Sequence, residues 1–114
     1  MRKQKIEHTA FEVATQVRTV EDTIDAALAE IAELQSRLVR ARSVTGAGVA
    51  TGHAAFEQLA ASLQALVTAR GGMARCHAEL VDAKQSVPGL RTVSFGDHEC
   101  PEEPSAQGSL RIVA

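Results

Sequence analysis

A heptad pattern of apolar residues constrains the fold of this chain more than any other feature of its sequence. With Ala10 at position a, every a and d position is apolar as far as residue 41: Ala10, Val13, Val17, Val20, Ile24, Ala27, Ile31, Leu34, Leu38 and Ala41. A three-four spacing held over this length is typical of a helix with a coiled-coil seam. Because Thr9 and Glu12 also fit a capping box, the sequence predicts a helix over about residues 9–44.

A second heptad pattern predicts another helix over about residues 53–85. Its large apolar residues at a and d are Phe56, Leu59, Leu63, Leu66, Met73 and Leu80. The e positions of this segment, including Val67, are apolar as well, so its apolar face is wider than a single seam. Pro88 and Gly89 then stop the helical pattern.

The stretch TGAGVATG, residues 45–52, separates the two predicted helices. Its glycines can adopt the left-handed backbone conformations that end one helix and turn the chain, and Thr51 is expected to cap the second helix. Two long helices joined by a short loop fold back on each other as an antiparallel hairpin. Residues 1–87 are therefore expected to form one helical hairpin.

The predicted fold class is all-α: an antiparallel two-helix coiled-coil hairpin that dimerises into a four-helix bundle and carries a short C-terminal tail. Aromatic residues make up only 3% of the chain, and this composition argues against a β-sandwich. The second helix presents more apolar surface than one partner helix covers. This excess predicts self-association, most simply as a two-fold dimer.

The tail, residues 88–114, differs in composition from the hairpin. It contains two short β-like runs, LRTVSF and SLRIVA, on either side of a segment rich in proline, glycine and acidic residues. Two isolated strands are only marginally stable in water. Two interpretations stay open: an extended flap over the helix ends, or a tail without fixed structure.

Polar residues interrupt the seam of the second helix at Arg70 and His77. A hairpin that turns near Val49 places Arg70 opposite Leu28, with Glu30 as a neighbour. The same hairpin places His77 near Glu21 and Asp22. Polar residues at a positions cost stability but specify the register between helices. We therefore expect the register of the hairpin to be set by Arg70, His77, Glu21 and Glu30.

The cysteine and histidine residues are weak candidates for metal ligands: Cys76, His77, His98 and Cys100. Cys76 and His77 are adjacent on a helix and point about 100° apart, so they rarely bind one ion together. We expect Cys76 to be a small buried side chain instead, and we expect no metal site and no cofactor. A disulfide between Cys76 and Cys100 is the alternative in an oxidising compartment.

The sequence lacks the motifs of common enzyme classes. It contains no G-x-S-x-G, no H-E-x-x-H and no phosphate-binding loop with its lysine, so we expect a protein that is not an enzyme. It also lacks an apolar run of about 20 residues and the apolar core of a secretory signal. We therefore expect a cytoplasmic protein without a membrane span.

The first functional hypothesis is a protein–protein interaction module, such as an adaptor, an assembly factor or a small regulator. Basic clusters at residues 2–5 and 37–42 leave a second hypothesis open, a regulator associated with nucleic acid. The net charge of −2 argues against a general attraction to nucleic acid. A third hypothesis is a helical bundle that binds a metal or a ligand.

Overall fold

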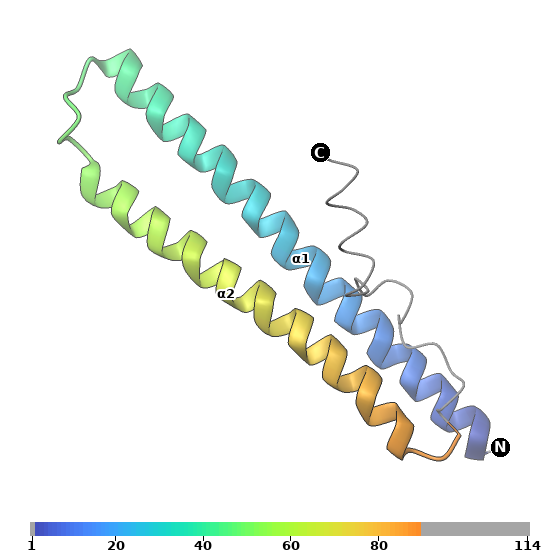
Figure 1. Ribbon diagram of the computed structural model, residues 1–114. Coiled ribbons are helices and arrows are strands. Elements are labelled where there is room, and N and C mark those ends of the chain that lie inside the picture. Colours follow the sequence, from blue (N-terminus) through green and yellow to red (C-terminus); the bar gives the residue numbers. More distant parts are fainter. Residues whose placement is uncertain (1, 90–114) are drawn as a thin grey trace, which may run out of the picture. The chain divides into compact units, whose positions relative to one another are not determined.

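The computed structural model describes residues 2–89 of the 114-residue chain as two helices and a short 3₁₀ turn (Figure 1). Helix α1 comprises Arg2–Thr45, helix α2 comprises His53–Ala83, and the 3₁₀ turn spans Lys84–Ser86. No strand occurs within this range, and no helix in it has the length and apolarity needed to cross a membrane. The two β-like runs of the tail lie outside the described residues.

Two compact units divide the chain, and each contains parts of both helices. The turn unit, Arg18–Ala74, holds the end of α1, the connecting turn and the start of α2. The terminal unit consists of Met1–Val17 together with the residues from Arg75 onward. Within each unit, a stretch of α1 packs against a stretch of α2 that runs in the opposite direction (Figure 1). The expected all-α helical hairpin is therefore confirmed.

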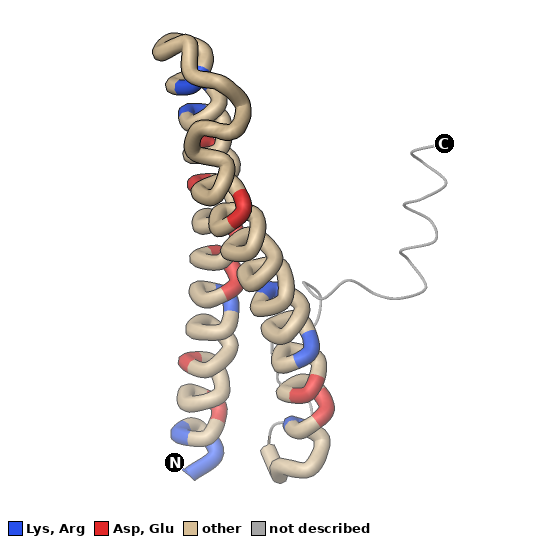
Figure 2. The backbone as a smooth tube through the Cα atoms, turned by 90° about the vertical axis from the view of Figure 1, so that its left-hand side faces the viewer, with Lys and Arg blue, Asp and Glu red and all other residues tan. Residues whose placement is uncertain are grey.

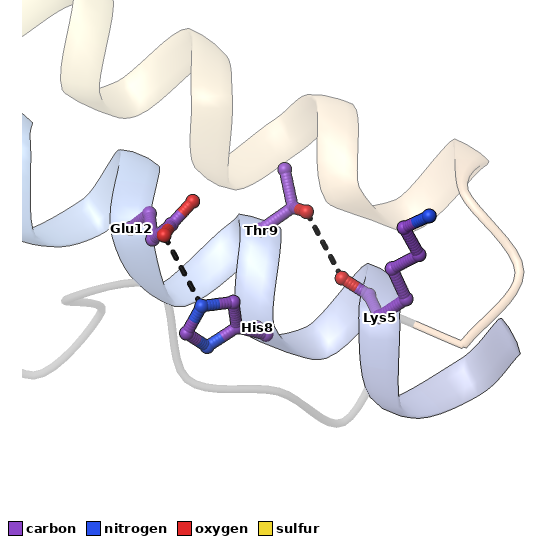
Figure 3. A network of polar contacts seen from close by, with 4 residues as sticks. All are labelled: Lys5, His8, Thr9 and Glu12. Atoms are coloured by element: carbon purple, nitrogen blue, oxygen red, sulfur yellow. Dashed lines mark hydrogen bonds and ion pairs between the residues drawn. The ribbon is translucent and has the colours of Figure 1, made fainter. Parts of the chain in front are cut away.

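Helix α1 begins well before the start that the capping pattern predicts. The Thr9 hydroxyl donates a hydrogen bond of 2.9 Å to the carbonyl oxygen of Lys5, one turn earlier in the same helix (Figure 3). Thr9 therefore lies inside the helix, where threonine side chains commonly bond to a preceding carbonyl, and it does not cap a helix start. Beside it, His8 Nε2 and Glu12 Oε1 lie 3.1 Å apart across the next turn of α1.

The turn between the helices depends on two glycines with left-handed backbone angles. Gly46 has a φ of 69° and Gly52 a φ of 77°. The carbonyl oxygen of Gly52 accepts hydrogen bonds from the N–H groups of Ala55, at 3.0 Å, and Phe56, at 3.4 Å. Gly52, and not Thr51 as expected, is thus the residue that precedes α2 and starts its hydrogen-bond ladder.

Very little of the hairpin is buried. Among residues 2–89, the buried ones are Ala10, Val17 and Lys84, and all three belong to the terminal unit. No residue of the turn unit is buried. A single pair of helices encloses only the strip of side chains that lies between them, and the rest of each apolar face stays in contact with water.

The predicted seam is therefore half-buried instead of forming a closed core. The half-buried seam residues are Val20, Ile24, Ile31, Leu38, Phe56, Leu59, Leu66, Met73 and Leu80. Contrary to the prediction, Val13, Leu34 and Leu63 are exposed. In α1 the inward face is rotated toward the e row, where Leu28 is half-buried, and this rotation leaves Leu34 at d outside the seam.

Replacing Gly52 with alanine should destabilise the hairpin. A left-handed φ costs a residue with a Cβ about 1–2 kcal/mol, and the reduced freedom of the unfolded chain offsets part of this cost. We expect a net loss of about 1 kcal/mol in the free energy of unfolding, measured by thermal denaturation followed by circular dichroism.

Gly48→Ala is the matched control for this experiment. Gly48 lies in the same turn, and a Cβ added to it would meet no atom within 4 Å, as at Gly52, but its φ is not left-handed. This variant should be as stable as the natural protein or slightly more so. Equal losses in both variants would show that backbone strain is not the cause.

Candidate functional site

Large apolar side chains are exposed on both helices of the turn unit. Leu34 of α1 is 48% exposed, and Leu63 and Val67 of α2 are 37% and 47% exposed. Single exposed apolar residues are ordinary in folded proteins and need no explanation. Here, however, they belong to heptad rows in a unit without a buried residue, so they mark surface that the hairpin itself does not cover.

An ion pair joins the two helices within the turn unit. Arg70 Nε lies 2.6 Å from Asp25 Oδ1, so the partner of Arg70 is Asp25 and not Glu30. The hydrogen bond and the charge of Asp25, followed by the charge of Glu21, raise the pKa of Arg70 above its ordinary value. Both partners are more than half exposed to solvent, so the pair contributes more to the register than to stability.

The other predicted register residues have less defined roles. Glu21 is half-buried in the turn unit, and Glu30 is exposed there. His77 is half-buried in the terminal unit. A pairing of His77 with Glu21 therefore stays a prediction, whereas the Arg70–Asp25 pair is a register contact that the structure shows directly.

The candidate metal ligands do not assemble in the described part of the chain. Cys76 is an exposed free thiol, contrary to the expectation of a small buried side chain, whereas its neighbour His77 is half-buried. Within residues 2–89, no three histidine, cysteine or acidic side chains gather closely enough to hold an ion. His98 and Cys100 lie outside this range, and so does the alternative disulfide.

Two of the three arginines of the basic cluster at the end of α1 make local contacts. Arg37 Nε lies 2.9 Å from Glu33 Oε1, one turn earlier in the helix. Arg42 Nη1 donates a hydrogen bond of 3.0 Å to the carbonyl oxygen of Ala47 in the turn. Figure 2 shows acidic and basic residues interspersed along the helices, without a continuous basic stripe. These observations do not favour a nucleic-acid surface here.

A groove with a volume of about 550 Å³ lies between the two helices in the terminal unit. No acidic residue is among the described residues that line it. The heptad pattern alone does not predict this groove. The one hint in the sequence is Ile6, an apolar residue just before the heptad run, which lines the groove. Its lining combines apolar residues and cations, chiefly Ile6, Ala10, Val13, Leu80, Arg2, Lys5 and Lys84.

No family model matches this chain, and no curated protein or solved structure is significantly similar to it. Two surfaces therefore carry the functional argument. The first consists of the exposed apolar residues of the turn unit, and the second is the groove of the terminal unit.

Removing the charge of Asp25 should lower the melting temperature slightly, because Arg70 then loses its anionic partner. The loss from Asp25→Asn should shrink at high salt, which screens exposed pairs. Thermal denaturation at low and high ionic strength measures both effects.

Glu33→Gln provides the control, because it removes an ion pair that lies within α1 alone. If the Arg70 pair sets the register, exchanging the two charges with Asp25→Arg and Arg70→Asp should restore stability relative to either single change. A double variant no more stable than its single parents would contradict that role.

Proposed function

We propose that this chain is a non-enzymatic protein–protein interaction module whose helical hairpin associates with a second copy to form a four-helix bundle. One observation supports the proposal above the others: the turn unit contains no buried residue, although its heptads supply large apolar side chains. In a four-helix bundle, such side chains lie between the helices and form the core.

The exposed side chains can supply a substantial part of the association energy. Complete burial of a valine or leucine side chain contributes about 1.5–3 kcal/mol. Burying the parts of Leu34, Leu63 and Val67 that are now exposed would therefore contribute on the order of 1 kcal/mol each. A two-fold dimer uses every contact twice, which gives about 6 kcal/mol from these residues. Association costs about 4–15 kcal/mol in lost freedom, so the remaining half-buried seam has to contribute as well.

A second copy is the simplest partner for this surface. It presents the same heptad rows, so that each apolar row finds a matching row in a symmetric arrangement. Ser62 and Ala69 in the g row of α2 are small and exposed, which allows another helix to approach closely. A module of this kind acts by presenting a surface to other proteins, as an adaptor, an assembly factor or a small regulator does.

Sedimentation velocity of a charged variant of α2 tests the proposal. Leu63→Lys combined with Val67→Lys should shift the protein from dimer to monomer, because four lysines would face each other across the symmetric interface. If each lost side chain removes on the order of 1 kcal/mol, dimerisation should weaken by roughly three orders of magnitude.

The matched control is Gln64→Lys combined with Thr68→Lys. These residues are exposed on the same stretch of α2, outside the apolar rows, and the change in charge is the same. The control should remain dimeric. A natural protein that sediments as a compact monomer, with a melting temperature independent of concentration, would show that the proposal is wrong.

A further inference from the structure

The groove of the terminal unit has its charges at one end and apolar residues along the rest of its length. The cations Arg2 and Lys5 lie in the first turns of α1, and Lys84 follows the end of α2. Further along α1, in the direction of Val13, the lining becomes apolar. Because the two helices are antiparallel in this unit, the start of α1 and the end of α2 form the same end of the groove (Figure 1).

Among the described residues that line the apolar part of the groove, no polar side chain needs a partner. Thr9 lines the groove, but its hydroxyl already donates to the carbonyl oxygen of Lys5 within α1 (Figure 3). Among residues 2–89, no buried side-chain nitrogen or oxygen lacks a hydrogen-bond partner. A ligand in this part of the groove would therefore gain from apolar contact and would not need to supply hydrogen bonds.

We propose that this groove binds a single-chain anionic amphiphile, with a long-chain fatty carboxylate as the ligand. The carboxylate would lie at the end formed by Arg2, Lys5 and Lys84, and the acyl chain would lie along Ile6, Ala10 and Leu80. The volume of about 550 Å³ is within the range of small-molecule sites, about 300–1,000 Å³, which are mostly apolar with a few polar groups that fix orientation.

The separation of charge and apolar surface favours this ligand over an acidic peptide. An amphipathic peptide distributes its carboxylates along its length, and it would need cations along the whole groove. Here the cations are confined to one end, which matches a ligand with one terminal charge. Arg2 and Lys5, which are exposed at this end, can reach the charged group of a ligand, and Lys84 beside them is 6% exposed. This inference does not depend on the proposed dimer.

The length of the groove sets a limit on the acyl chain. From Arg2 to Val13, helix α1 rises about 16 Å, which an extended chain of about a dozen carbons would span. Each methylene buried up to that length should tighten binding about two- to threefold, somewhat less than for full burial because the groove is open on one side. Longer chains should bring little further gain.

Isothermal titration calorimetry of the full chain with tetradecanoate, below its micelle concentration, tests the proposal. We expect one ligand per chain, weaker binding of shorter carboxylates, and a loss of at least about tenfold in affinity for Lys5→Glu. Lys3→Glu is the matched control, since Lys3 lies on the same turns of α1 but does not line the groove, and it should bind nearly as well as the natural protein.

A second pair of variants tests the apolar part. Val13→Ser should weaken binding because Val13 lines the groove. Phe11→Ser is the matched control: Phe11 is also apolar, lies two residues away and is 66% exposed, but it does not line the groove. This control should bind the ligand as well as the natural protein. Circular dichroism of each variant establishes that α1 is retained.

Three results would overturn the proposal. Equal losses in Lys3→Glu and Lys5→Glu would show general charge attraction without a site. Equal affinity for tetradecyltrimethylammonium would show that the cations do not select the ligand. An absence of binding to the natural protein would show that the groove is not a site for this ligand.

Discussion

Everything in this structure depends on one geometric constraint: two helices in a single layer can shield only one strip of each other's surface. A globular core requires at least a second layer, so that an apolar face is covered from more than one direction. In this chain the apolar rows occupy three heptad positions on α2, which is wider than the strip that α1 covers. The uncovered part of the face is consequently a property of the fold and not a local defect.

The pattern of burial in α1 follows from the heptad position of each side chain in that strip. Within residues 2–89 the buried apolar residues are Ala10 and Val17, both at a positions of α1, whereas Val13 at a d position is 39% exposed although it has the same size as Val17. Leu34, at a d position, is 48% exposed, whereas the a-position residues Ile31 and Leu38 of similar size are half-buried. A helix that covers one of its two seam rows better than the other gains little hydrophobic stabilisation per seam residue.

The sequence predicts the helices well because their periodicity extends over many turns, and an error at one position does not break the pattern. It fails at points where a single residue has two possible roles. Thr9 fits a cap in the sequence but bonds to the carbonyl of Lys5 inside the helix. A hairpin centred on Val49 predicts Glu30 as the acidic neighbour of Arg70, yet Arg70 pairs with Asp25. The long arginine side chain can reach a carboxylate about one helical turn from the position opposite it. The groove escapes prediction because it depends on both helix ends together.

The limited stability of the hairpin bears directly on the proposed association with a second copy. Helix α2 continues without a break through Gly71 and Gly72, and each glycine inside a helix costs about 1 kcal/mol relative to alanine. Folded domains have a net stability of about 5–15 kcal/mol, which arises mainly from buried apolar surface. The turn unit, with no buried residue, has little such surface to offset this cost. Covering Leu63 and Val67 with another helix would add stabilisation in the same unit, on α2 itself, so folding and association of this chain should be coupled.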